Sequence, residues 1–211
     1  MKKRLIVGAL GIILFLTMLF LGGGWYSNFL SLLAVLAYCE WVNINRKSRK
    51  NQFTIADISY FLIGLLYVGY GFFCLMDLRL QPNGLYRSLL LLSIVWASDT
   101  GAYFIGKYWG HSPLCPRISP KKTWEGAFAA ILFGMLVTIV FSTFIQLRYN
   151  PIIIGLIISV SAIIGDLIES MIKRKYNVKD SGYLLPGHGG ILDRFDSLIF
   201  VSIVVSLFRL S

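Results

Sequence analysis

The chain has 211 residues, of which 56% are hydrophobic and only 14% are charged, and its mean hydropathy is +0.71. Soluble domains carry about a quarter charged residues, so this composition excludes a water-soluble globular protein and indicates a polytopic membrane protein. A net charge of +10 would suggest nucleic-acid binding in a soluble chain. Here basic loops on the cytoplasmic side of a membrane explain the charge without nucleic acid.

Seven apolar segments are long enough, or nearly so, to cross a bilayer as helices, which takes about 20 residues each. In chain order they are Leu5–Leu21, Trp25–Val42, Phe53–Leu75, Leu85–Gly106, Trp124–Leu147, Pro151–Ile172 and Phe195–Leu210. Three consecutive glycines at 22–24 predict a tight turn between the first two. Because no repeat or long linker interrupts the series, the sequence predicts an all-α helical bundle that forms one integral membrane domain over residues 1–211.

The basic residues give this bundle an orientation. With the N-terminus in the cytoplasm, sixteen of the twenty Lys and Arg residues fall in cytoplasmic segments and four fall on the other side. Positive charge is retained on the cytoplasmic side of membrane proteins. The pattern therefore predicts a multi-pass protein of the cell's inner (plasma) membrane, with a cytoplasmic N-terminus and an outward C-terminus.

The acidic residues share this asymmetry, since nine of the ten lie at or near cytoplasmic helix ends. Asp99 and Asp166 each lie within a predicted span, about 10–12 Å from its cytoplasmic end at 1.5 Å per residue. Two acids at matching depth on different helices predict a water-filled cavity that opens to the cytoplasm. Glu40 and Asp57 are interpreted as local partners of the basic cluster between Arg46 and Lys50.

The most polar stretch of the chain, from Ile164 to Ser197, connects the last two apolar segments. Asp166, Glu169 and Lys173 have the spacing that places side chains on one face of a helix. Asp193 and Asp196 form a second pair, three residues apart, at the start of the next helix. Carboxylates beside a Lys/Arg cluster suit Mg²⁺ and a polyphosphate, because the metal takes hard oxygen ligands and the cations take phosphate oxygens.

A second motif, SPKKTWEG at 119–126, precedes the fifth segment. Ser119 followed by Pro120 predicts a helix N-cap with proline in the first turn. Two lysines next to a helix N-terminus form an anion site, because the free N–H groups and the helix dipole both favour phosphate. On spacing alone, ordinary positive-inside lysines explain Lys121 and Lys122 equally well.

Four runs together resemble the signature of the phosphatidate cytidylyltransferases, also called CDP-diacylglycerol synthases. They are SMIKR at 170–174, KDSG at 179–182, LPGHGG at 185–190 and LDRFD at 192–196. SPKKTWEG and DTGAY at 99–103 also look like segments of this family. The resemblance covers roughly residues 96–200, which carry all the motifs named above, and leaves the first 95 residues without one.

The resemblance implies an Mg²⁺-dependent nucleotidyltransferase that condenses CTP with phosphatidic acid to CDP-diacylglycerol and pyrophosphate. Its implied partners are CTP, phosphatidic acid and the lipid bilayer, with no nucleic acid and with a homodimer left open. Asp166, Asp193 and Lys173 are the expected catalytic residues, and the metal ligands are expected among Asp166, Asp193, Asp99 and Asp196. Substrate contacts are expected from Ser119, Lys121, Lys122, Thr123, Arg174, Lys179 and His188.

Two other classes of protein remain open. One is a related CTP-dependent enzyme that acts on an isoprenoid-type lipid, such as a dolichol kinase or a CDP-archaeol synthase. The other is an ion transporter, because acids within membrane spans also mark ion pathways. A transporter should carry acids at the bilayer midplane or on both sides, whereas here they gather on one side. For Asp166 and Asp193, a salt bridge to Lys173 or Arg194 is the structural alternative to metal binding.

Overall fold

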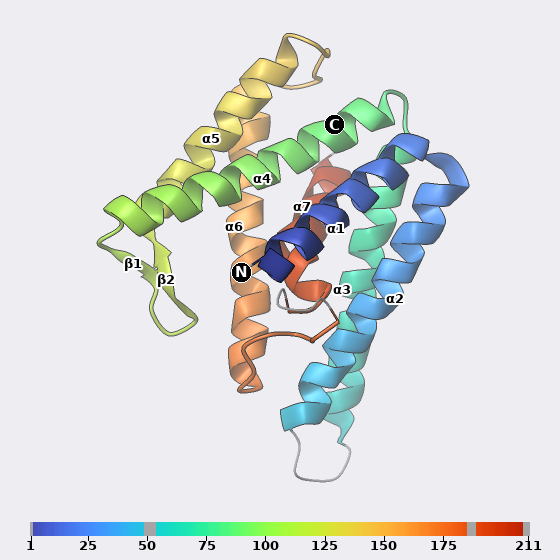
Figure 1. Ribbon diagram of the computed structural model, residues 1–211, viewed down its shortest axis with the longest axis vertical. Helices are drawn as coiled ribbons and strands as arrows, with labels where there is room; N and C mark the ends of the chain where they lie inside the picture. Colours follow the sequence, from blue (N-terminus) through green and yellow to red (C-terminus); the bar gives the residue numbers. More distant parts are fainter. Residues whose placement is uncertain (1, 49–53, 185–188, 209–211) are drawn as a thin grey trace.

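The computed structural model describes residues 2–48, 54–184 and 189–208 (Figure 1). Within these ranges the chain forms seven helices and one two-stranded hairpin. In chain order the elements are α1 (Lys2–Leu21), α2 (Gly23–Ser48), α3 (Ile55–Leu80), α4 (Gly84–Trp109), β1 (Pro113–Cys115), β2 (Ser119–Thr123), α5 (Trp124–Ser142), α6 (Pro151–Lys175) and α7 (Leu192–Phe208).

Five of the described helices, α2 to α6, are long and apolar enough to cross a membrane. The apolar part of α1 is shorter, from Ile6 to Leu21, and α7 has 17 residues. The prediction of an all-α protein of the multi-pass membrane type is therefore confirmed at this level, and the hairpin is its one departure within the described ranges. The count of seven spans and the cytoplasmic N-terminus stay predictions.

Local sequence explains where the helices begin and end. Gly22 and Gly23 have φ angles of +63° and +51°, a backbone that favours glycine, so α1 reverses into α2 as the glycine run predicts. Asn150 caps α6, because its side chain accepts a hydrogen bond from Ile152 N at 2.9 Å and Pro151 occupies the first turn. Asp57 forms a capping box with Thr54 at the start of α3.

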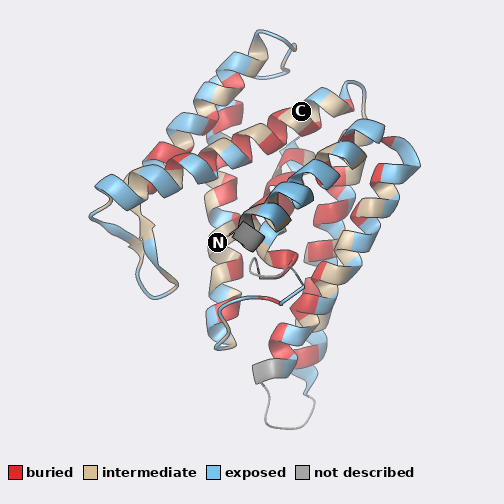
Figure 2. Ribbon diagram, viewed as in Figure 1, coloured by how far each residue is buried: buried red, intermediate tan, exposed pale blue. Residues whose placement is uncertain are grey.

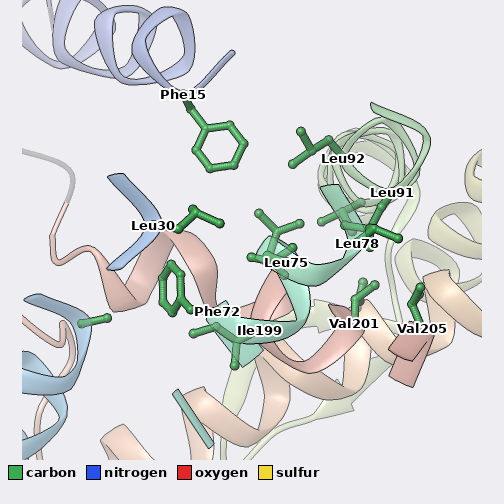
Figure 3. Packing of buried hydrophobic residues seen from close by; sticks show 14 of the residues in the cluster. Phe15, Leu30, Phe72, Leu75, Leu78, Leu91, Leu92, Ile199, Val201 and Val205 are labelled. Atoms are coloured by element: carbon green, nitrogen blue, oxygen red, sulfur yellow. The ribbon is translucent and has the colours of Figure 1, made fainter. Parts of the chain in front are cut away.

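The helices pack as two groups that α7 joins (Figure 1). Helices α4, α5 and α6 pack on one another in succession, α2 packs on α3, and α7 contacts both α3 and α6. Buried positions concentrate where these helices face each other, while exposed apolar side chains cover much of the outside (Figure 2). Phe72 of α3 and Ile199 of α7 lie together at the centre of this core (Figure 3), and both are fully buried.

Candidate functional site

A cavity of about 700 Å³ lies between α4, the β-hairpin, α5 and α6. Its charged lining consists of two acids and three lysines: Asp99, Asp166, Lys107, Lys121 and Lys122. Much of the remaining wall is alanine, glycine, leucine and isoleucine, so charged and apolar surfaces meet in one space. The structure therefore brings together the acids predicted to share a cavity and the lysines of the second motif.

Close packing of α4, α5 and α6 fixes the position of this cavity. Ser98 Oγ donates to Ala130 O at 3.0 Å and lies 3.0 Å from Ser159 Oγ, so this buried serine of α4 is hydrogen-bonded to both α5 and α6. A Cβ atom at Gly134 would collide with Ser159 Oγ, and one at Gly155 would collide with the backbone at Met135. Small residues permit this close approach of helices, which holds the neighbouring Asp99 at a fixed distance from α6.

The prediction that Ser119 caps a helix is wrong. Residues 119–123 form strand β2, which pairs antiparallel with β1, and the helix cap is Thr123, whose Oγ1 accepts from Gly126 N at 3.2 Å. Pro120 is tolerated in β2 because each strand of a two-stranded sheet has a free edge. Glu125 closes the base of the hairpin by accepting from Ser112 N at 3.1 Å. The hairpin consequently projects Lys121 and Lys122 into the cavity from a strand.

Asp166 forms an ion pair with Lys122 at the cavity wall. The side chain of Asp166 is 33% exposed, while the Lys122 ammonium is buried against it. Asp99 lies within electrostatic range of Asp166, Asp196 and Lys122. The salt-bridge alternative named Lys173 or Arg194 as the partner of Asp166 and of Asp193. The structure pairs Asp166 with Lys122 of the other motif instead, and it does pair Asp193 with Lys173.

A second, enclosed cluster lies closer to the C-terminal end of α6. Lys173 Nζ is 2.8 Å from Asp193 Oδ1 and 3.3 Å from Glu169 Oε1. The exposed fractions of these side chains are 11% for Lys173, 7% for Asp193 and 2% for Glu169, so little water screens the three charges. Asp196 lies within electrostatic range of Asp166 as well as Lys173. It thereby links this cluster to the cavity.

Asp193 also holds the segment that joins α6 to α7. Its carboxylate accepts hydrogen bonds from Ser181 N at 3.0 Å and Gly190 N at 2.7 Å, in addition to the Lys173 ammonium. This pattern places the signature residues of the loop, the end of α6 and the start of α7 around one carboxylate. The prediction that Asp193 and Asp196 stand in the first turns of a helix is confirmed by α7.

The other predicted substrate contacts have different surroundings. Arg174 Nε donates to Ile118 O at 3.2 Å and its Nη1 donates to Val178 O, so Arg174 joins the β-hairpin to the loop after α6. Lys179 is exposed on that loop, and Ser119 pairs with Cys115 in the hairpin. His188 lies outside the described residues. Substrate contacts of these four residues stay predictions.

The partners of one acidic residue, Glu40, were predicted wrongly from the sequence. Glu40 of α2 was interpreted as a partner of the basic cluster that follows it, but its carboxylate accepts hydrogen bonds from Ser181 Oγ and Leu192 N in the signature region. The available signal was an acid within an apolar helix, which is costly unless it has a specific partner. Lys107 also lines the cavity, whereas from the sequence it was interpreted only as one of the sixteen basic residues that indicate the orientation in the membrane.

The donor set of the cavity suits Mg²⁺, which is commonly held by one or two carboxylates together with waters and substrate phosphates. Asp99 and Asp166 provide two such carboxylates on the cavity wall. Among the described residues, no three His, Cys, Asp or Glu side chains are arranged to hold a metal ion by themselves. Any divalent ion here would therefore need oxygen ligands from water or substrate.

The sequence model of the cytidylyltransferase family matches residues 2–211. Among similar proteins is the phosphatidate cytidylyltransferase of Staphylococcus epidermidis, 45% identical over 155 residues, which are 72% of this chain and 59% of that protein. The phosphatidate cytidylyltransferases of Staphylococcus saprophyticus and Bacillus subtilis are 40% and 39% identical, over 93% and 95% of this chain. The matched parts are 75% and 78% of those two proteins, so this chain spans only part of the length of each relative.

Proposed function

This chain belongs to the cytidylyltransferase family, and we propose that it transfers the cytidylyl group of CTP to phosphatidic acid, forming CDP-diacylglycerol and pyrophosphate. One observation carries the proposal beyond family membership. The cavity presents acids and lysines beside an apolar wall, which is the chemistry needed to receive a nucleoside triphosphate and a lipid phosphate together.

In the proposed reaction a phosphate oxygen of phosphatidic acid attacks the α-phosphorus of CTP. A bond forms between that oxygen and the α-phosphorus, while the bond from the α-phosphorus to the oxygen that bridges to the β-phosphate breaks. Pyrophosphate leaves with that electron pair. Because the lipid phosphate is already a nucleophile, the protein's main tasks are to hold two anions in line and to offset their repulsion.

The lysines of the cavity would hold the anionic substrates in place. Lys121, Lys122 and Lys107 line the cavity and would bind the triphosphate, while Lys173 would offset charge at the end of α6. The predicted Mg²⁺ would be held by Asp166 and Asp193, with Asp99 and Asp196 as further candidates; the contacts of Asp166 and Asp99 with the cavity support these two most directly. When bound, the ion would polarise the phosphate and neutralise charge that develops during transfer.

Substitution of the hairpin lysines tests the proposal that they bind the triphosphate of CTP. We expect Lys121→Ala to raise the KM for CTP about tenfold with little change in kcat, because a phosphate contact made equally in the ground and transition states affects binding alone. Lys122→Ala should raise the KM and also lower kcat, since Lys122 contacts Asp166. Arg117→Ala, on the turn of the same hairpin, is the control. If the Lys121/Lys122 double variant kept the wild-type KM for CTP, these lysines would not bind the nucleotide and would serve only as positive charges on the cytoplasmic side of the membrane.

We further propose that the site faces the cytoplasm in a multi-pass protein of the inner membrane. The turn at Asn83 and the loop before α6 lie at one end of the bundle, whereas the β-hairpin and the α6–α7 segment lie toward the other (Figure 1). Reporter fusions at Asn83 and Asn150 should therefore read outside, and fusions at Ser112 and Asn177 should read inside. A reversed pattern would contradict a cytoplasmic site. Association into a homodimer stays a prediction.

The lipid substrate is tested by supplying purified protein with CTP, Mg²⁺ and a panel of lipids. We expect product from phosphatidic acid and none from diacylglycerol or a dolichol-type alcohol, because those lipids lack the attacking phosphate. Product from the alcohol alone would favour the CTP-dependent kinase. Ion flux without any product would favour a transporter.

A further inference from the structure

Glu40 belongs to α2, in the part of the chain that carries none of the family motifs, yet its carboxylate lies in the signature region. The residue is only 3% exposed. Its Oε2 accepts from Ser181 Oγ at 3.0 Å and from Leu192 N at 2.9 Å. Ser181 lies within the segment that joins α6 to α7 and Leu192 begins α7, so one carboxylate holds two separate points of this part of the chain.

The backbone of this segment fits closely around Glu40. At Gly182 and at Gly190 a Cβ atom would collide with the Glu40 carboxylate. Glycine at both positions lets the backbone approach the carboxylate this closely, and a larger residue at either position would displace the Glu40 side chain. The LPGHGG run and the KDSG run thus each contribute a glycine to the pocket that receives one side chain of α2.

Asp193 holds the same segment through a different set of hydrogen-bond donors. Ser181 donates its backbone N–H to Asp193 and its hydroxyl to Glu40. Gly190 donates its N–H to Asp193, while Leu192, two residues on, donates to Glu40. Any displacement of Glu40 would therefore move the groups that orient Asp193, and through Asp193 the Lys173 ammonium.

The burial of Glu40 is costly for stability alone. Within the described part of the chain its Oε1 has no hydrogen-bond partner, and a buried polar atom without a partner lowers the stability of the folded state. A buried carboxylate that is only partly satisfied invites a functional explanation. The contacts of Glu40 lead to the lysine and the carboxylate on which the proposed transfer depends.

We propose that Glu40 is a positioning residue for the transfer reaction: it holds the segment after α6 at Ser181 and the start of α7 at Leu192, and so sets the placement of Asp193 and Lys173. This inference rests on the proposed function. Glu40 itself need not touch either substrate. Its role is to hold other groups in register, where a misplacement of about 1 Å can cost on the order of a hundredfold in rate.

The test compares Glu40→Gln with Asp57→Asn in the full-length protein. Both substitutions remove a buried carboxylate charge with little change in volume, and Asp57 is also buried but contacts Thr54 and Asn45, away from the signature. We expect Glu40→Gln to lower kcat about tenfold or more at a nearly unchanged KM for CTP. Asp57→Asn should lower thermal stability and keep kcat within about twofold per folded molecule.

A second readout does not need the reaction. Hydrogen exchange of backbone amides in peptides that cover 180–194 should increase in Glu40→Gln and stay at the wild-type level in Asp57→Asn, because Glu40 accepts hydrogen bonds from this segment whereas Asp57 contacts Asn45 and Thr54. The double variant Glu40→Gln/Ser181→Ala should lose less than the product of the two single losses in kcat, since both remove the same contact.

These outcomes separate the two proposals. Unchanged exchange in Glu40→Gln, or wild-type kcat per folded molecule, would overturn the positioning role. The positioning role would also be overturned if Glu40→Gln and Asp57→Asn lost stability and kcat to the same extent. That is the result expected if Glu40 only stabilises the fold. If wild-type protein forms no CDP-diacylglycerol, the proposed function fails. Faster exchange confined to the Glu40 variant would then still show that Glu40 helps to hold this segment in place.

Discussion

Asp166→Asn is expected to lower turnover by about a thousandfold or more while the protein stays folded and inserted. The substitution keeps the shape of the side chain but removes the negative charge that pairs with Lys122 at the cavity wall, and with it the anionic carboxylate proposed as a ligand for Mg²⁺. The measurement is kcat for CDP-diacylglycerol formation over a range of Mg²⁺ concentrations. Asp193→Asn should be equally severe, because Asp193 also orients Lys173 and the signature segment.

The matched control is Asp77→Asn, at the other end of the bundle, where Asp77 accepts a hydrogen bond from Gln81. That variant should keep near-normal turnover. A charge exchange then separates a metal ligand from a salt bridge. Because the structure pairs Asp166 with Lys122, the double variant Asp166→Lys/Lys122→Asp is the one to make. Substantial recovery of activity in it would reduce Asp166 to a salt-bridge partner.

Lys173→Met is expected to damage both folding and turnover. The substitution keeps an apolar side chain of similar length but leaves Glu169 and Asp193 buried without their shared cation. Breaking a buried pair by removing one partner costs about 3–5 kcal/mol. The loss should appear as a lower melting temperature of the purified protein in detergent and as a large fall in kcat per folded molecule.

Lys175→Met is the control for this variant, since Lys175 stands in the last turn of the same helix but is exposed. It should change neither the melting temperature nor kcat appreciably. The double variant Lys173→Met/Asp193→Asn should be less destabilised than the sum of the single variants, because the two charges neutralise each other. Normal stability in Lys173→Met would show that the enclosed cluster contributes little to the fold.

Sequence periodicity predicted the helices because bilayer-length apolar runs have few alternative structures. The cavity acids were predictable for a related reason: Asp99 and Asp166 interrupt apolar helices at matching depth. The β-hairpin was missed because its strands are short and polar, and because Ser-Pro before a helix is also a frequent capping pattern. Thr123, rather than Ser119, took the cap because the hairpin occupies the residues before it.

The contacts between segments that are distant in the sequence were harder to predict. Nothing in the spacing of α6 indicates that Lys122, rather than Lys173, pairs with Asp166, because that contact depends on how the hairpin folds over the cavity. Glu40 was assigned to its sequence neighbours for the same reason. Its actual donors, Ser181 and Leu192, reach it only after α7 has packed against the N-terminal helices.

The central claim, transfer of a cytidylyl group, is tested most directly by following two labels of CTP. Purified protein in phosphatidic-acid vesicles with Mg²⁺ is supplied with CTP labelled at the α-phosphorus or, in a parallel sample, at the γ-phosphorus. The account predicts that the α-label appears in the extracted lipid and the γ-label in water-soluble pyrophosphate. Appearance of the γ-label in the lipid would show kinase chemistry, and it would contradict the account.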